Sequence, residues 1–82
     1  MKIKKTMTAV DVAALLIDAN LDFEYYHLSE AFCIDMPYGD QDRIVYSSIY
    51  SKWFIAHDGE LEPLTQLSFD AWKYFAQGGC TE

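Results

Sequence analysis

The residues between Phe23 and Leu64 favour β-strands, and a segment with helical periodicity lies on each side of them. A helix and a sheet each have one apolar face to bury. For the order helix, strands, helix, the economical packing is an antiparallel sheet with both helices on one face. At 82 residues we expect a single domain. We therefore predict a small α+β protein with an N-terminal helix, a three- to four-stranded antiparallel sheet and a C-terminal helix. It would form one compact domain over 1–82, with flexible ends at 1–6 and 78–82.

The first helical segment covers 7–20. Thr8 is a good N-cap residue, and Asp11, three residues later, can complete a capping box with it. Val12 and Leu16 recur at helical spacing and belong to an apolar stripe. This pattern predicts an amphipathic helix whose acidic residues form a ridge opposite its apolar face.

The second helical segment covers 68–77. Ser68 is the expected N-cap, and Phe69 and Trp72 belong to the apolar stripe. Gly78 follows the segment and is typical of the residue that ends a helix. We therefore predict a second amphipathic helix after the strands.

Four stretches between the helices carry strand signals: 23–28, 31–36, 43–57 and 60–64. The third is ambiguous, because its β-branched and aromatic residues favour a strand whereas its serines repeat at helical spacing. We favour a strand there, with a break near Ser51. Asp58-Gly59 is the strongest signal for a two-residue hairpin turn.

The charge of the chain limits what the protein can bind. Thirteen Asp and Glu oppose six Lys and Arg, which gives a formal net charge of −7. No Lys or Arg occurs from Thr6 to Asp42, and three of the six basic residues lie in the first five positions. Phosphate affinity comes from Lys and Arg, so we expect no direct binding of nucleic acid.

Two interpretations of this acidity remain open. Charge of one sign can simply keep a small aromatic-rich domain in solution. Alternatively, spaced carboxylates on a rigid frame can bind a basic surface, with tyrosines as anchors inside an acidic rim. The candidate partner-binding residues are Asp11, Asp18, Asp22, Glu24, Tyr26, Glu30, Asp35, Tyr38, Asp40, Asp42, Asp58, Glu60 and Glu62.

Catalytic and metal-binding signals are weak. The chain has no C-x-x-C or H-x-x-x-H spacing, and Cys33 with His27 or His57 is the one nucleophile–base combination to weigh. We therefore expect no metal, no cofactor and no enzymatic activity. A single bridge between Cys33 and Cys80 would be unusual for a small secreted domain, so we expect free thiols and a cytoplasmic protein. No apolar run approaches the length of a membrane span.

These observations favour a small acidic non-enzymatic protein that occupies a basic, nucleic-acid-binding surface of a partner protein. The alternative is an accessory or antitoxin-like interaction module whose acidity serves only solubility. We expect a monomer or a homodimer that binds neither nucleic acid nor membranes directly. In size, acidity and absence of motifs the chain resembles the class of small phage-encoded inhibitors of host defence, such as anti-CRISPR proteins. That likeness covers no specific residues.

Overall fold

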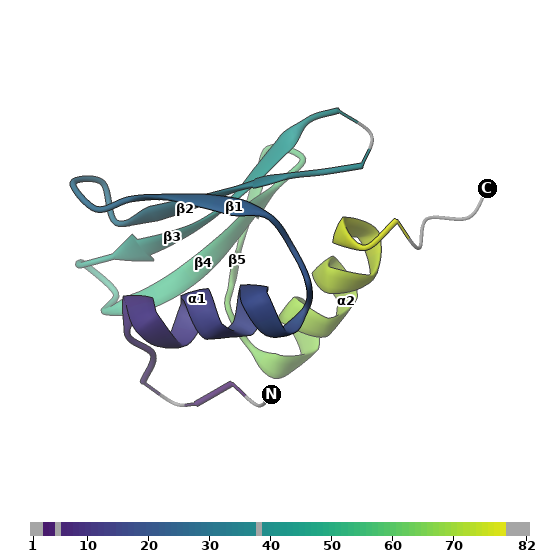
Figure 1. The fold of residues 1–82 in the computed structure, drawn as a ribbon. Helices are drawn as coiled ribbons and strands as arrows, with labels where there is room; N and C mark the ends of the chain where they lie inside the picture. Colours follow the sequence, from purple (N-terminus) through teal and green to yellow (C-terminus); the bar gives the residue numbers. More distant parts are fainter. Residues whose placement is uncertain (1–2, 5, 38, 79–82) are drawn as a thin grey trace.

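The computed structural model describes residues 3–4, 6–37 and 39–78. Within them, the chain forms two helices and five strands, and their arrangement can be followed in Figure 1. In chain order, the elements are α1 Ala9–Asp18, β1 Phe23–Tyr26, β2 Ala31–Asp35, β3 Gln41–Ser47, β4 Lys52–His57, β5 Glu60–Pro63 and α2 Gln66–Ala76. The predicted α+β class is confirmed.

The strands form one antiparallel sheet in the order β1-β2-β3-β4-β5, so each strand pairs with its neighbours in sequence. The predicted antiparallel sheet is confirmed, but the predicted number of three to four strands is wrong. The stretch 43–57 is divided between β3 and β4, because Ser51 has a φ of 54° in the turn that joins them. The break expected near Ser51 is therefore confirmed, and the short strand β5 brings the number to five.

The turn between β4 and β5 has the predicted form. Asp58 and Gly59 have φ angles of 54° and 80°, and the flanking His57 pairs with Glu60. Positive φ at both central residues is the requirement of a type I′ turn, whose twist matches that of the strands. The Asp-Gly signal therefore fixes where β4 ends.

Both helices begin with a capping box. In α1 the Thr8 hydroxyl accepts from the backbone N–H of Asp11, and the Asp11 carboxylate accepts from the backbone N–H of Thr8, as predicted. The N-cap of α2 is Thr65, so the prediction of Ser68 is wrong. The Ser68 hydroxyl instead accepts from the Thr65 backbone N–H at 2.9 Å and occupies the third position of the helix. Two hydroxyl residues three apart form the box together, and the first of them is the cap.

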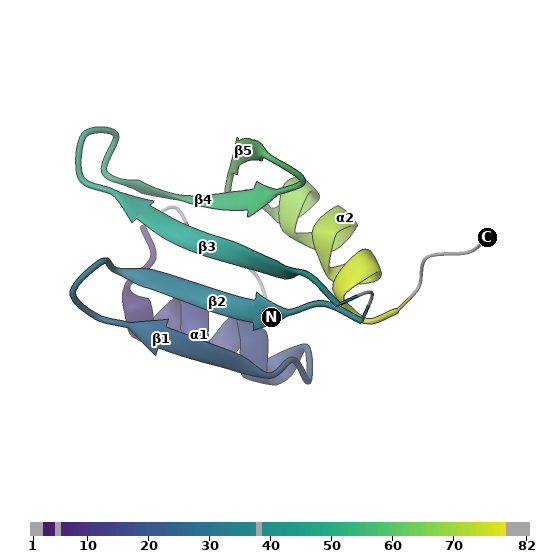
Figure 2. The same ribbon diagram turned by 90° about the horizontal axis from the view of Figure 1, so that it is seen from above.

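One apolar core joins side chains of both helices to those of the inner strands. Its buried members are Val12, Leu15, Leu16, Phe32, Ile34, Met36, Ile44, Trp53, Ile55, Phe69, Trp72 and Ala76. Figure 1 shows both helices on the same side of the sheet, and Figure 2 shows the other face with no described helix over it. The indole N–H of Trp53 donates to the Met7 carbonyl oxygen at 2.9 Å and ties the start of α1 to the sheet. The sheet thus has one covered face and one open face.

Most of the ends predicted to be flexible, 1–6 and 78–82, lie outside the described residues. The described part of the N-terminal end contacts the rest of the fold. The backbone N–H of Ile3 donates to Gln66 Oε1 at 2.9 Å, and Lys4 Nζ donates to Asp11 Oδ1 at 3.1 Å. Residues 3 and 4 therefore lie between the starts of the two helices.

Candidate functional site

Three segments that are distant in sequence meet at one end of the sheet. In an antiparallel meander, alternate connections lie at the same end. Figure 1 shows the α1–β1 loop, the β2–β3 connection and the β4–β5 turn together beside the C-terminal end of α2. The segments 18–23, 35–42 and 57–61 contain no Lys or Arg. They contain seven acidic residues: Asp18, Asp22, Asp35, Asp40, Asp42, Asp58 and Glu60. We call these three segments the acidic end.

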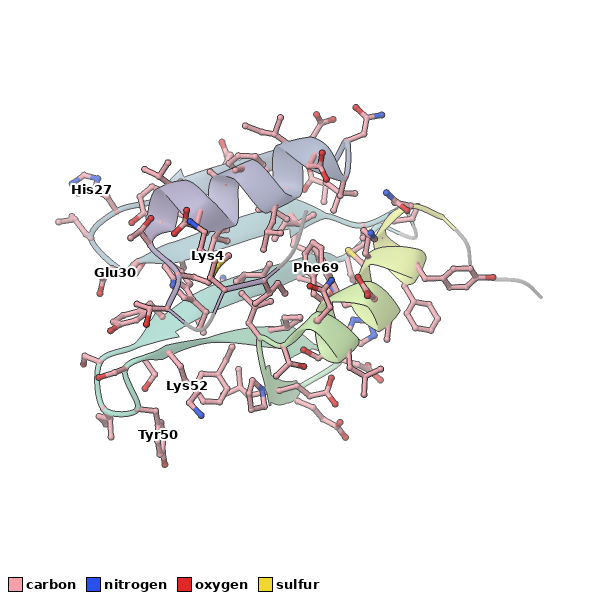
Figure 3. The ribbon with its side chains drawn as sticks, turned by 90° about the horizontal axis from the view of Figure 1, so that it is seen from below. Lys4, His27, Glu30, Tyr50, Lys52 and Phe69 are labelled. Carbon is pink, nitrogen blue, oxygen red and sulfur yellow. The ribbon has the colours of Figure 1, made fainter. Side chains whose placement is uncertain are left out.

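The opposite end of the sheet has a mixed charge. Figure 3 shows His27, Glu30, Tyr50 and Lys52 at this end, where the β1–β2 and β3–β4 turns lie. Near the start of α1, Lys4 forms an ion pair with Asp11 at 3.1 Å. The three segments of the acidic end therefore carry acidic residues without Lys or Arg, with Arg43 next to them in β3 and Lys73 in α2, whereas the turns of the opposite end carry both signs of charge.

Most of the predicted binding residues are exposed, but they do not form one surface. The exposed ones are Asp18, Asp22, Glu24, Tyr26, Glu30, Asp35, Asp40, Asp58, Glu60 and Glu62. Asp11 is half-buried at the start of α1, Asp42 is buried, and Tyr38 lies outside the described residues. Six of these exposed residues belong to the acidic end: Asp18, Asp22, Asp35, Asp40, Asp58 and Glu60.

Some of the predicted residues already have partners within the chain. Asp35 accepts from Gln41 Nε2 at 2.8 Å, and Glu24 accepts from the Tyr26 hydroxyl at 2.8 Å. That bond to Glu24 raises the pKa of Tyr26, because deprotonation would put two negative charges side by side. The backbone N–H of Thr8, followed by the Lys4 ammonium, lowers the pKa of the Asp11 carboxyl. Asp11 therefore acts first as a helix-capping carboxylate.

Asp42 is the acidic residue whose position departs most from the predicted surface. Its side chain is 5% exposed. Its Oδ2 atom lies 2.5 Å from His57 Nδ1 and accepts from the Trp72 indole N–H at 2.8 Å. A buried carboxylate needs such donors to replace the water that it has lost. The contact also assigns the Nδ1 proton of His57 to this bond, because a carboxylate only accepts.

The Asp42–His57 pair was missed by the sequence reasoning, although a signal for it exists. Asp42 precedes Ile44 by two positions, and His57 follows Ile55 by two. Side chains two apart on a strand share a face, and Ile44 is paired with Ile55 in the register. Asp42 and His57 therefore lie opposite each other on the covered face. Finding them required the register of the β3–β4 hairpin, which the ambiguity of 43–57 hid.

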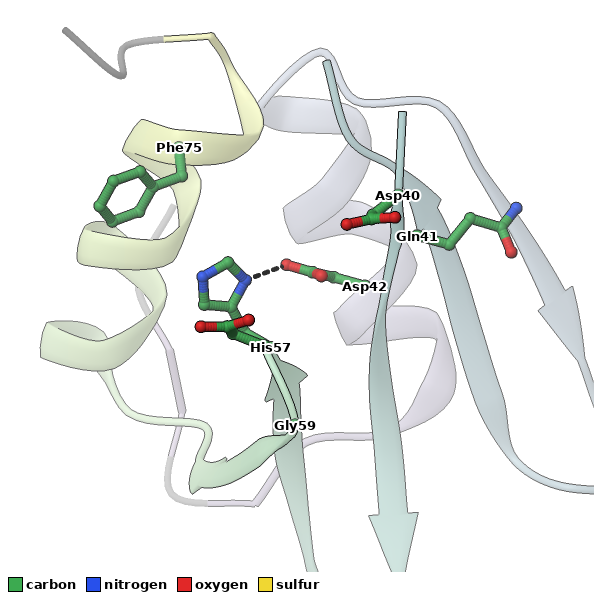
Figure 4. Close-up of a pocket in the computed structure, with 7 residues that line it drawn as sticks. Asp40, Gln41, Asp42, His57, Gly59 and Phe75 are labelled. Atoms are coloured by element: carbon green, nitrogen blue, oxygen red, sulfur yellow. Dashed lines mark hydrogen bonds and ion pairs between the residues drawn. The ribbon is translucent and has the colours of Figure 1, made fainter. Parts of the chain in front are cut away.

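A pocket of about 460 Å³ opens beside this pair (Figure 4). It is lined by Asp40, Gln41, Asp42, His57, Asp58, Gly59 and Phe75. The rings of His57 and Phe75 are nearly parallel, with an interplanar angle of 18° and centroids 6.0 Å apart. Figure 4 shows the second ring nitrogen of His57 on the side of α2, away from Asp42. The imidazole is thus held by Asp42 on one side and flanked by an aromatic ring on another.

The lining of this pocket determines the chemistry that it can support. Among the lining residues, which are all described, none carries a hydroxyl, thiol or amine nucleophile. His57 can hydrogen-bond a ligand or accept a proton through Nε2, since Nδ1 is held by Asp42. Asp40 and Asp58 are exposed and add two carboxylates. The arrangement favours non-covalent binding of a group that is positively charged or rich in hydrogen-bond donors.

The other sequence candidates do not join this site. Cys33 is a buried free cysteine. Cys33 pairs with Arg43 in the register, so the two side chains share a face of the sheet. Arg43 follows Asp42 directly, and neighbouring side chains on a strand point to opposite faces. Cys33 therefore lies on the open face, away from His57. Within the described part of the chain, no group of three or more His, Cys, Asp or Glu could hold a metal ion. Cys80 lies outside the described residues.

Over the described residues, neither helix has the length and apolar character needed to cross a membrane. Comparisons with protein-family models, with curated proteins and with solved structures found no match for this chain.

Proposed function

We propose that the protein is a non-enzymatic binding protein whose acidic end occupies a basic, nucleic-acid-binding surface of a partner protein. The observation that carries the proposal is the convergence of 18–23, 35–42 and 57–61, with seven acidic residues and no Lys or Arg, at one end of the sheet. Like charges held together destabilise a compact fold, so their gathering from three separate segments points to a use.

The distribution of charge suits this mode of binding. A field of one sign at one end of a small molecule steers it toward a basic surface and orients it on approach. Exposed carboxylates on strand ends and tight turns lie on a rigid frame, as the phosphates of a nucleic acid do. The most specific form of the proposal is an inhibitor that mimics nucleic acid, in the manner of phage anti-defence proteins, and acts in the cytoplasm as a monomer or homodimer.

The experiment is a capture of partners from nuclease-treated extracts of the source cells, with elution by rising salt. Two charge-reversal pairs change the net charge by the same amount. Asp22→Lys with Glu60→Lys alters the acidic end outside the pocket, and Glu30→Lys with Glu62→Lys alters acidic residues outside the acidic end. We expect the wild type and the second pair to retain a nucleic-acid-binding protein that releases at moderate salt and that added nucleic acid displaces. We expect the first pair to lose it. Equal loss with both pairs, or no loss with either, contradicts the proposal.

One observation favours a second candidate, an accessory module that binds through the open face of the sheet. Several large apolar side chains on this face or in the turns beside it are exposed, among them Tyr26, Ile49, Tyr50 and Leu61. Tyr50 contacts Phe54, whose ring centroid lies 5.8 Å away. If this candidate is correct, Tyr50→Ala with Leu61→Ala abolishes capture, whereas Asp22→Lys with Glu60→Lys leaves it unchanged.

A further inference from the structure

We propose that the pocket lined by Asp40, His57, Asp58 and Phe75 binds the guanidinium group of an arginine side chain presented by the partner. The inference rests on the proposed function and names the group that the acidic end recognises. It is carried by the shape and chemistry of a single pocket, whereas the proposed function rests on the charge of the whole end.

The first element of the pocket is a fixed aromatic wall. The His57 ring is held by Asp42 Oδ2, which also accepts from the Trp72 indole. These bonds join β3, β4 and α2, so the imidazole cannot turn without breaking a buried contact. Phe75 lies nearly parallel to it at 18° and is 39% exposed. A guanidinium is planar and stacks on such faces, whereas a compact ammonium is more strongly hydrated.

The second element is a pair of available carboxylates. Asp40 and Asp58 both line the pocket and both are exposed. Asp42 is not available, because it is buried and its Oδ2 accepts from two donors within the chain. Guanidinium presents five N–H donors in a plane and forms paired bonds to carboxylates. His57 Nε2 supplies a further acceptor when the imidazole is neutral, since its proton lies on Nδ1.

The third element is what the pocket excludes. No Lys or Arg lines it, so the lining itself supplies no ammonium or guanidinium group to the carboxylates. An anionic ligand would meet Asp40 and Asp58 and be repelled. The volume of about 460 Å³ is within the range of small-ligand sites and admits the end of a long side chain with some water. Planarity, positive charge and multiple donors together identify arginine rather than lysine.

The test uses the full chain and three small probes followed by NMR. The probes are N-acetyl-arginine amide, N-acetyl-citrulline amide, which has the same shape without the charge, and N-acetyl-lysine amide. We expect saturable shifts of the His57 imidazole, the Gly59 amide and the Phe75 ring with the arginine probe. The citrulline probe should bind about tenfold more weakly, because charge-assisted bonds are roughly twice as strong as neutral ones. The lysine probe should bind several-fold more weakly than the arginine probe.

Matched variants locate the binding. Asp40→Asn with Asp58→Asn removes two charges from the pocket, and Asn tolerates the positive φ at 58. Asp22→Asn with Glu60→Gln removes two charges from the acidic end outside the pocket lining. We expect the first pair to weaken arginine binding about tenfold and the second by less than about twofold. Circular dichroism shows whether each pair keeps the fold.

The inference is overturned if the arginine probe does not bind, or if the citrulline or lysine probe binds as tightly as the arginine probe. It is also overturned if the shifts avoid the pocket or if both pairs of variants lose the same affinity. The outcomes remain separate from those of the capture experiment. If Asp22→Lys with Glu60→Lys loses the partner but the arginine probe does not bind, this inference fails and the proposed function stands. If the arginine probe binds the pocket but Asp22→Lys with Glu60→Lys captures the partner as well as the wild type does, the proposed function fails and the pocket assignment stands.

Discussion

The two ends of the sheet use their acidic residues differently. At the start of α1, Asp11 caps the helix and pairs with Lys4. At the acidic end, the three segments contain seven acidic residues and no Lys or Arg. Of these, Asp42 alone is buried, and it holds His57 and Trp72 together. An acidic residue in this fold thus caps a helix, accepts buried hydrogen bonds or presents an exposed charge, according to the element in which it lies.

The largest expected effect on stability distinguishes the buried Asp42 from the exposed acidic residues of the same end. Asp42→Ala leaves the His57 and Trp72 N–H groups without their acceptor and opens a space in the core. We expect a loss of about 3 kcal/mol in the free energy of unfolding. Asp40→Ala, at an exposed position of the same end, should cost less than about 0.5 kcal/mol. Urea unfolding of both variants measures the difference, and equal losses would contradict the role of Asp42 as a buried hydrogen-bond acceptor.

The next largest effect on stability is expected at the opposite end of the sheet, where α1 begins. Thr8→Ala removes the hydroxyl that accepts from the Asp11 backbone N–H, and it should cost about 1 kcal/mol. Thr8→Ser keeps an N-cap hydroxyl and serves as the control. Thermal unfolding compares the two variants. If serine fails to rescue the loss, the hydroxyl is not the source of the stability.

A smaller effect follows from the pKa of Asp11, which the Thr8 backbone N–H and Lys4 lower. A carboxyl with a lowered pKa in the folded state favours folding above its unfolded pKa. The contribution disappears as the pH falls through the folded value. Stability of the wild type should therefore decline below about pH 4, and part of that decline should vanish in Asp11→Asn. Unfolding curves of the two proteins between neutral and acid pH measure this, and parallel declines would contradict the assignment.

The smallest effect concerns repulsion within the acidic end. Asp22→Asn with Glu60→Gln should raise stability by about 0.3 kcal/mol at low ionic strength, and added salt should erase the gain. Glu30→Gln with Glu62→Gln removes the same charge away from that end and should give a smaller gain. The comparison is made by urea unfolding at two salt concentrations. A larger gain from the second pair would show that the acidic residues outside the acidic end repel more strongly.

Local signals predicted much of the fold. The Thr8–Asp11 capping box and the Asp58-Gly59 turn each depend on residues within three positions of one another, and both form as predicted. The cap of α2 was misplaced because Thr65 and Ser68 are both good caps, and only the path of the preceding strand decides between them. The break near Ser51 was predicted, but its consequence, two separate strands, changes the strand number.

The site depended on information that local signals lack. That 18–23, 35–42 and 57–61 meet at one end follows from the alternation of connections, which requires the number of strands to be known. The Asp42–His57 contact required the pairing register as well. The exposure of Asp22, Asp40 and Asp58 was predictable from their position beside turns, whereas the burial of Asp42 was not.

The central claim is that the position of the charge, rather than its amount, directs binding. The most direct test measures the association rate of the purified partner at several ionic strengths. The proteins compared are the wild type, Asp22→Lys with Glu60→Lys, and Glu30→Lys with Glu62→Lys. We predict a rate that falls steeply with salt for the wild type and the second pair, and a slow rate with little salt dependence for the first pair. Indistinguishable rates for the two pairs would contradict the claim, because their net charges are equal and only the positions differ.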